Sequence, residues 1–128
     1  MGDLLQEATQ WLGGMLKTHV SRPVTYLRGL ASAVVSATRG RSVFELTDDF
    51  NQTIRVETAD FLIDTADLVL DDERTLPNSG DRIEESQEDQ VFVFEVMAPG
   101  GGEPPYRYSD PYRNKLRIHT KHVDTRDV

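Results

Sequence analysis

Two histidines in the segment HTKH, His119 and His122, are the first candidates for chemistry in this sequence. Imidazole nitrogens are common ligands of Zn²⁺. On a β-strand, however, residues three apart point to opposite faces, so the two rings cannot easily share one ion. We therefore expect ordinary surface histidines and no metal site. The third histidine, His19, is expected to interact with the negative end of a helix dipole.

Three pairs of adjacent acids are the next candidates, since two carboxyl groups can act as general acid and base or bind calcium. Adjacent residues on a strand point apart, and none of the pairs lies in a D-x-D-x-D-G calcium loop. We expect these acids to lie in turns and on the solvent-facing sides of strands. The pairs are Asp48 and Asp49, Asp71 and Asp72, and Glu84 and Glu85.

Nucleophile and phosphate-binding motifs are absent from the sequence. No serine lies in a G-x-S-x-G elbow, and the glycine-rich segments at 40–42 and 100–102 lack the G-x-x-x-x-G-K-[ST] pattern. The chain contains no cysteine, which excludes disulfides, thiolate catalysis and cysteine-ligated zinc. We therefore predict a protein that is not an enzyme and has no cofactor.

The 128 residues suffice for one domain with one core, and their net charge of −8 is unevenly distributed. Residues 1–42 contain five Lys or Arg against two acids, residues 43–103 contain three against 17, and residues 104–128 contain six against three. In one interpretation, the central acids are solvated and keep the protein soluble. In the other, an acidic flank of one subunit faces a basic flank of the next. Sequence-specific binding to nucleic acid is disfavoured, because no concentrated basic face is predicted.

The first twenty residues differ from a secretory signal, because Asp3 and Glu7 lie where such a signal is basic. No stretch approaches the roughly 18 consecutive apolar residues that a membrane span requires. We expect a soluble protein of a reducing cytoplasm, without a membrane partner.

Apolar residues in 1–20 recur with helical spacing, which predicts an amphipathic α-helix. Asp3 is a suitable N-cap, and Pro23 follows the end of the helix. Two residues of the apolar stripe, Trp11 and Met15, either pack in the core or contact a neighbouring subunit. The stripe consists of Leu4, Leu5, Ala8, Trp11, Leu12, Met15 and Leu16.

Beyond Pro23 the apolar residues alternate and turn signals recur, which is typical of β-strands. The predicted fold class is mainly β: a small antiparallel β-barrel or sandwich of about seven strands with an N-terminal α-helix. We predict a single domain over 1–128, with the barrel at 22–123 and a flexible tail at 124–128. The predicted strands include 24–28, 30–39, 42–46, 50–64, 91–97 and 114–123, and 66–70 is a short apolar segment before an acidic turn.

The segment TLPNSGDRIEE at 75–85 predicts a tight turn that leads into a strand hairpin. Pro77 fixes its own φ at about −65°. Gly80 can adopt positive φ without steric cost, and Asp81 follows it into the strand. We interpret these three residues as defining the turn and assign them no chemical role.

Three glycines and four prolines predict a long loop at 98–113, with Tyr106, Tyr108 and Tyr112 as its anchors. This loop is either a plain connection or a segment that becomes ordered against a partner. In the second case, the basic residues after the glycines would contact an acidic surface of that partner. The candidate contacts are Gly100, Gly101, Gly102, Pro104, Pro105, Arg107, Arg113 and Lys115.

Several segments together resemble the small phage and prophage head-tail joining, or head-completion, proteins. In that family a P-x-x-G-D segment similar to Pro77–Asp81 opens a late hairpin of the barrel. The resemblance covers most of the chain from about residue 20 to residue 123. The segments are SRPVTYLRG, FLIDTADLVL, LPNSGDRIEE, a strand of the type VFEVM, and the final YRYSDPYRNKLRIHTK.

The resemblance implies a non-enzymatic β-barrel connector that joins the head, at its portal or adaptor, to the tail during virion assembly. Its expected partners are portal, adaptor and tail proteins. It is expected to form a ring of identical subunits in the virion and to be a monomer when free. The implied locations are the host bacterial cytoplasm during assembly and the virion neck. The alternative from a different class is a monomeric cellular β-barrel module that binds a peptide or protein through the 98–113 loop.

Overall fold

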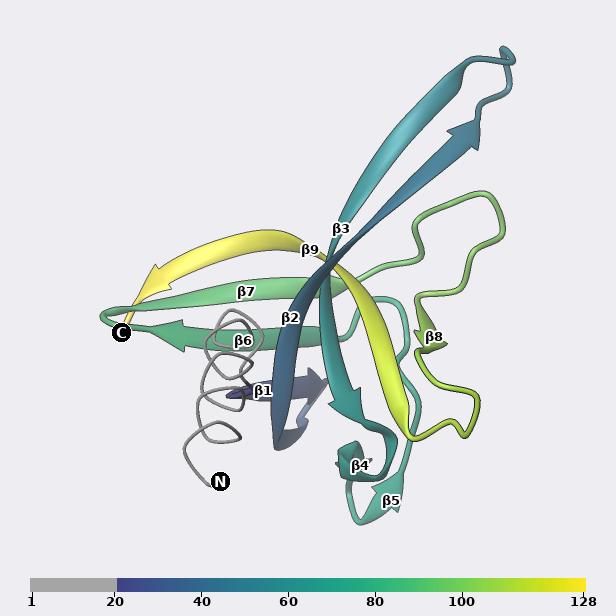
Figure 1. Ribbon diagram of the computed structural model, residues 1–128. Helices are drawn as coiled ribbons and strands as arrows, with labels where there is room; N and C mark the ends of the chain where they lie inside the picture. Colours follow the sequence, from purple (N-terminus) through teal and green to yellow (C-terminus); the bar gives the residue numbers. More distant parts are fainter. Residues whose placement is uncertain (1–20) are drawn as a thin grey trace, which may run out of the picture.

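The computed structural model describes residues 21–128, which are mainly β-strand, as predicted (Figure 1). The predicted helix at 1–20, with Trp11, Met15 and His19, lies outside the described residues. The elements are β1 (Arg22–Arg28), β2 (Ala31–Thr47), β3 (Thr53–Asp64), the 3₁₀ turn η2 (Thr65–Asp67), β4 (Val69–Leu70), β5 (Glu73–Arg74), β6 (Arg82–Gln87), β7 (Gln90–Val96), β8 (Tyr106–Tyr108) and β9 (Lys115–Asp127).

Seven strands form one antiparallel sheet in the order β3-β2-β1-β6-β7-β9-β8. β9 pairs with β8 and β3 through its first half and with β7 through its second half. The pairing of β9 with β3 joins the two ends of the series, so β3, β2, β1, β6, β7 and β9 form a closed cycle of hydrogen-bonded neighbours. Such closure pairs strand edges that an open sheet would expose. β4 and β5 form a separate two-stranded hairpin.

The core lies inside this cycle, because alternate residues of each strand point inward. On β3, for example, the inward residues Phe61 and Ile63 are at most 1% exposed. An irregularity in the β7–β9 pairing at Val93 and Phe94 lets both of these consecutive residues be buried. The core cluster consists of Val24, Tyr26, Val35, Ala37, Phe61, Ile63, Leu68, Leu70, Ile83, Phe94, Val96, Leu116 and Ile118.

The two strands predicted at 30–39 and 42–46 are one continuous strand, β2, so the predicted break at Gly40 was wrong. A β-carbon at Gly40 would lie 3.0 Å from Nη1 of Arg117 and 3.1 Å from Cδ1 of Leu62. This glycine therefore makes room for a side chain from β9 and does not end a strand.

Two other segments differ from their predictions. Residues 98–113, predicted to lack regular structure, contain the short strand β8. Residues 124–127, predicted as part of a flexible tail, continue β9 and pair with β7 as far as Gln90. These residues are almost all polar, so they lack the alternation that identifies a strand in sequence.

β2 and β3 continue beyond the rest of the sheet as a two-stranded ribbon, which projects from the body in Figure 1. β1 pairs with β2 only as far as Ala37, and β9 pairs with β3 only from Ala59 onward. We call residues 41–59 the arm. The extended chain from Gly40 to Asp48 spans about 26 Å, so the end of the arm lies far from the body.

Phe61→Ala should lower the free energy of unfolding by about 3–5 kcal/mol, because loss of a buried aromatic ring leaves a cavity. Phe61 is fully buried, and its ring packs edge-on against Phe94 with 5.1 Å between centroids. Phe50→Ala is the matched control: its ring is 83% exposed, so a change below about 0.5 kcal/mol is expected. Urea denaturation followed by circular dichroism measures both, and equal losses would contradict this placement of the core.

Candidate interaction surface

The two faces of the arm differ because alternate residues of β2 and β3 point to opposite sides. One face, which we call the apolar face, carries Phe44 opposite Val56 and Leu46 opposite Ile54. The other, which we call the charged face, has mostly charged side chains around one valine. Its residues are Arg41, Val43, Glu45, Arg55 and Glu57.

The glycine-rich loop between β7 and β8 lies against the apolar face of the arm. β-carbons added at Gly100 and Gly101 would lie 3.0 and 2.8 Å from methyl carbons of Leu46. The two glycines have φ of 116° and 63°, values that residues with side chains rarely adopt. The Glu103 N–H donates to the Gly100 carbonyl at 3.1 Å, and the Pro105 carbonyl accepts from the backbone of β9 at 2.8 Å. The loop is therefore ordered against its own chain, through glycines that allow close approach.

At the base of the arm, the apolar face becomes polar around Asp60, which is fully buried. Nη1 of Arg117 donates to Oδ2 of Asp60 at 2.8 Å, and Nδ1 of His119 lies 3.0 Å from Oδ1. The hydroxyls of Ser42 and Thr58 donate to the same carboxylate. The cluster thus joins β2, β3 and β9 at the point where the arm leaves the body.

Burial by itself would raise the pKa of Asp60, but the hydrogen bonds from the four surrounding donors hold it well below its usual range. The buried carboxylate is therefore ionised at neutral pH. The His119 ring also packs edge-on against Phe44, with 5.1 Å between centroids. The cluster does not have the order of a Ser-His-Asp triad, because Ser42 donates to Asp60 and not to the histidine. Its role is structural.

The charged face of the arm continues into two adjoining cavities, which we call the mouth. Arg39 lines both, with its guanidinium 4.7 and 4.6 Å from the ring centroids of Phe61 and Phe94. Nη1 of Arg39 also donates to the buried carboxylate of Glu85 at 3.0 Å, so this arginine separates the core from the mouth. A cavity of about 260 Å³ is lined by Arg39, Glu85, Gln87, Phe92, Phe94 and His122, and one of about 390 Å³ by Arg39, Gly40, Arg41, Glu57, Thr58, Ala59, Thr120, Lys121 and His122.

The end of the arm is a turn held together by its own hydrogen bonds. Oδ1 of Asp48 accepts from the backbone N–H groups of Phe50 and Gln52 at 2.9 and 2.8 Å. Asn51, with φ of 61°, donates its N–H to the Asp48 carbonyl at 3.1 Å. We call residues 48–52 the tip. The exposed ring of Phe50 lies on this turn. Exposed aromatic side chains on a fixed turn often anchor protein contacts.

A second ionic cluster attaches the segment before β6 to β1. Nη2 of Arg28 lies 2.8 Å from Oδ2 of Asp81, and the Tyr26 hydroxyl donates to the same oxygen at 2.5 Å. Burial and this hydrogen bond raise the pKa of Tyr26, so the phenol remains a neutral donor. Gly80 has φ of 95°, within the turn that the sequence indicates. Asp81 has a further role that the sequence did not reveal, since its carboxylate fixes the turn to the body.

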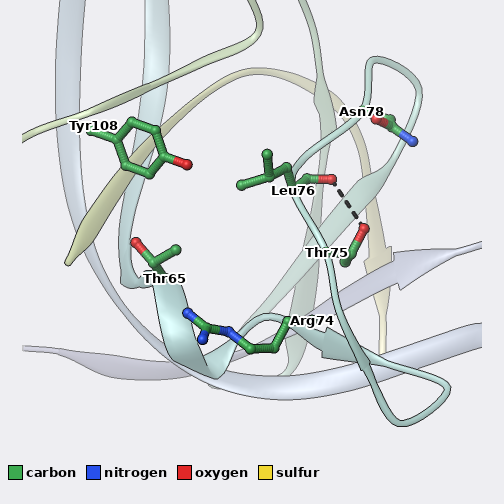
Figure 2. A pocket seen from close by; sticks show the side chains of 6 residues that line it. All are labelled: Thr65, Arg74, Thr75, Leu76, Asn78 and Tyr108. Carbon is green, nitrogen blue, oxygen red and sulfur yellow. Dashed lines mark hydrogen bonds between the residues drawn. The ribbon is translucent and has the colours of Figure 1, made fainter. Parts of the chain in front are cut away.

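The segment that follows β5 borders a concave region of about 480 Å³ (Figure 2). Figure 2 shows Tyr108 and Thr65 across this recess from Thr75 and Asn78. Arg74 supplies the charge in its lining, and Oγ1 of Thr65 is buried without a hydrogen-bond partner within residues 21–128. The recess offers hydrogen-bonding groups to a ligand, and its lining within residues 21–128 contains no carboxyl or imidazole group for acid–base chemistry.

The basic residues predicted as partner contacts do not form one surface with the glycines. Arg107 is exposed on β8. Arg113 places its guanidinium 5.4 Å from the ring centroid of Tyr108, and Lys115 forms an ion pair with Asp64. These three side chains lie on or beside β8 and the start of β9, whereas the glycines lie against the arm. Their contacts with partners remain predictions.

Buried polar side chains are the main feature that the sequence patterns missed. His119 and Glu85 were expected on the surface, but each is only 2% exposed, and each has a charged partner. Conversely, Tyr112 is 81% exposed, so the prediction that it anchors the loop was wrong. His122 is exposed and lies on the mouth, so the two histidines of the HTKH segment do not meet.

Within residues 21–128, no group of three or more His, Asp or Glu side chains could hold a metal ion. The same part of the chain contains no helix of the length and apolarity needed to cross a membrane.

The family described as phage head-tail joining protein matches residues 2–127. Searches of curated proteins and of solved structures return no match.

Acidification should destabilise the protein through Asp60. Because its folded-state pKa lies below the ordinary value of 3.8, ionised Asp60 stabilises the fold above that pH, and the stabilisation is lost as the pH falls through the folded-state value. The free energy of unfolding of the native chain should therefore fall between about pH 5 and pH 2, and that of Asp60→Asn should change less. At pH 7, Asp60→Asn should be less stable by about 3 kcal/mol, the low end of the range for breaking a buried ion pair, since the partly buried Arg117 loses its counter-charge. Asp64→Asn, at a half-exposed ion pair, should cost about 0.2–1 kcal/mol, and identical pH profiles for native and Asp60→Asn proteins would refute this role.

Gly101→Ala should be more destabilising than Gly102→Ala. Both residues have positive φ, so alanine at either position costs about 1–2 kcal/mol in backbone strain. A β-carbon at Gly102 meets open space, whereas one at Gly101 also displaces Leu46 from the apolar face. The difference in melting temperature between the variants therefore measures the contact of the loop with the arm. Equal melting temperatures would show that the loop does not rest on Leu46.

Proposed function

The chain belongs to the family of phage head-tail joining proteins, and we propose that it is a non-enzymatic connector that joins the phage head to the tail during virion assembly. Its partners are portal or adaptor proteins on the head side and tail proteins on the other. It assembles in the host bacterial cytoplasm and remains in the neck of the virion. A ring of identical subunits around the portal axis is the proposed assembly, with the free chain monomeric.

The projecting arm carries this proposal. It extends from the body without neighbouring strands on its outer edges over most of its length, and its tip presents an exposed phenylalanine. Both features suit association with other proteins, since unpaired strand edges and exposed aromatic side chains are common contact elements.

The body suits the same role because its strands form a closed cycle that is stabilised by ionic clusters between strands. We interpret the closed cycle of strands as a small β-barrel, with the core inside it and the arm and loops outside it. A connector transmits force between two large assemblies, so its contact elements require a rigid support. The ionic clusters at Asp60 and Asp81 supply that support where the arm and the 75–81 segment leave the barrel.

Several surfaces remain for head and tail partners besides the arm. Arg107 lies on β8, Arg113 contacts Tyr108 of the same strand, and Lys115 begins β9. These three residues are proposed to meet acidic groups of a partner. On sequence grounds, Trp11 and Met15 are proposed as a further contact with a neighbouring subunit. We propose no sequence-specific contact with DNA and no contact with a membrane.

A phage that lacks this chain should produce separate heads and tails instead of complete particles. Electron microscopy of lysates and infectious titre measure the defect, and supply of the native chain from a plasmid should restore both. Complete particles in the absence of the chain would refute the proposal.

Removal of residues 43–46 together with residues 54–57 provides the sharper variant. These two segments pair with each other, so the deletion shortens the arm and leaves the register on either side unchanged. The shortened chain should fold, as judged by circular dichroism, but should not restore particles. Leu30→Ser, at the exposed turn between β1 and β2, is the control that should restore them.

A further inference from the structure

The tip and the mouth differ in ways that make them complementary. The tip presents the Phe50 ring beside the exposed acid Asp49. The mouth combines the aromatic rings of Phe92 and Phe94 with nearby basic side chains. One surface is a projecting acidic and aromatic element, and the other is a basic and aromatic concavity.

The two surfaces cannot meet within one molecule. The mouth lies at the base of the arm, where Gly40 and Ala59 line it, whereas the tip lies at the far end. About 26 Å of extended chain separates Gly40 from the start of the tip. The arm is held straight between them by continuous β2–β3 pairing. Any contact between tip and mouth therefore joins two molecules.

We propose that the tip of one subunit inserts into the mouth of the next copy of this chain. This inference rests on the proposed connector function and names the contact between neighbouring subunits in its ring. The Phe50 ring enters the cavity of about 260 Å³, which has room for one aromatic side chain, and packs against Phe92 and His122. The Asp49 carboxylate lies over the adjoining cavity, near Arg41 and Lys121.

The charges of the mouth favour an acidic occupant. Glu85 is already neutralised by Arg39, and the Glu57 carboxylate lies 3.2 Å from Nη2 of Arg55. Arg41 and Lys121 form no ion pair within residues 21–128, so their charges are available to an incoming carboxylate. Asp49 also forms no ion pair there, whereas the Asp48 carboxylate is used by the tip itself.

The contact is directional, because a projecting element of one copy meets a concavity of another. Such heterologous contacts join different surfaces of identical subunits, and they generate a ring when the rotation between copies closes. The contacts of a twofold dimer are instead self-complementary. The geometry therefore fits the ring expected of a connector.

Cross-linking in assembled particles tests the contact directly. The chain has no cysteine, so Gln52→Cys at the tip and Gln87→Cys at the mouth introduce the only two thiols and leave Phe50, Asp49 and Lys121 in place. Particles assembled from this double variant and treated with a short bismaleimide should give a ladder of covalent oligomers of the chain. The control pairs Gln52→Cys with Leu30→Cys at the exposed β1–β2 turn and should give no ladder.

A charge exchange provides an independent measurement of the same contact. Asp49→Lys and Lys121→Glu should each lower the infectious titre by about tenfold, and the two changes together should restore most of the loss. Each variant should retain the melting temperature of the native chain, because both side chains are exposed.

The outcomes separate the contact from the connector function. Complete particles without a ladder, or a charge-exchanged double variant weaker than both single variants, would overturn the tip-and-mouth contact and leave the connector function intact. Complete particles in the absence of the chain would overturn the connector function itself. A ladder with titre restored by the double variant would support both.

Discussion

The buried carboxylate of Asp60 is the group on which the arrangement of β2, β3 and β9 depends. A charge that is fully removed from water is tolerated only when it is paired and hydrogen-bonded, and this one has four donors from three strands. Gly40 is part of the same arrangement, since a β-carbon there would lie 3.0 Å from the Arg117 guanidinium. The cluster lies where the closed cycle ends and the arm begins, so the direction of the arm follows from it.

Ion pairs also explain the uneven charge of the sequence. Acids of the central segment pair with bases from both ends of the chain, as in Arg28 with Asp81 and Arg126 with Glu84. Because these partners are far apart in sequence, each pair links strands that are remote along the chain. Neither interpretation of the acidic segment, as a solvated surface or as a contact between subunits, included this internal pairing. Acids that form no ion pair within residues 21–128, including Asp49, are those available to other molecules.

The sequence predicted the strand content and the turn at Gly80 because these depend on local signals, such as alternation and tolerance of positive φ. It did not predict the continuity of β2. In a sequence, a glycine such as Gly40 is equally consistent with the end of a strand and with a strand position that makes room for another side chain, here that of Arg117. His119 was misplaced for a similar reason: its burial depends on partners from other strands. The arm and the mouth depend on where β1 and β9 stop pairing with their neighbours, which no local pattern records.

The glycine loop and the tip are both ordered in the free chain, which lowers the conformational entropy that is lost when they bind a partner. A contact element that is fixed before binding loses less conformational entropy on association than a disordered one. The loop rests on Leu46 and the tip on the Asp48 carboxylate, so both are shaped in the free chain. A directional contact between copies, however, forms a closed ring only at one rotation and an open filament at others. In the proposed assembly, a single tip in a single mouth does not fix that rotation, so a template such as the portal surface would have to supply it. Shape would then be held by the chain and rotation set by the template.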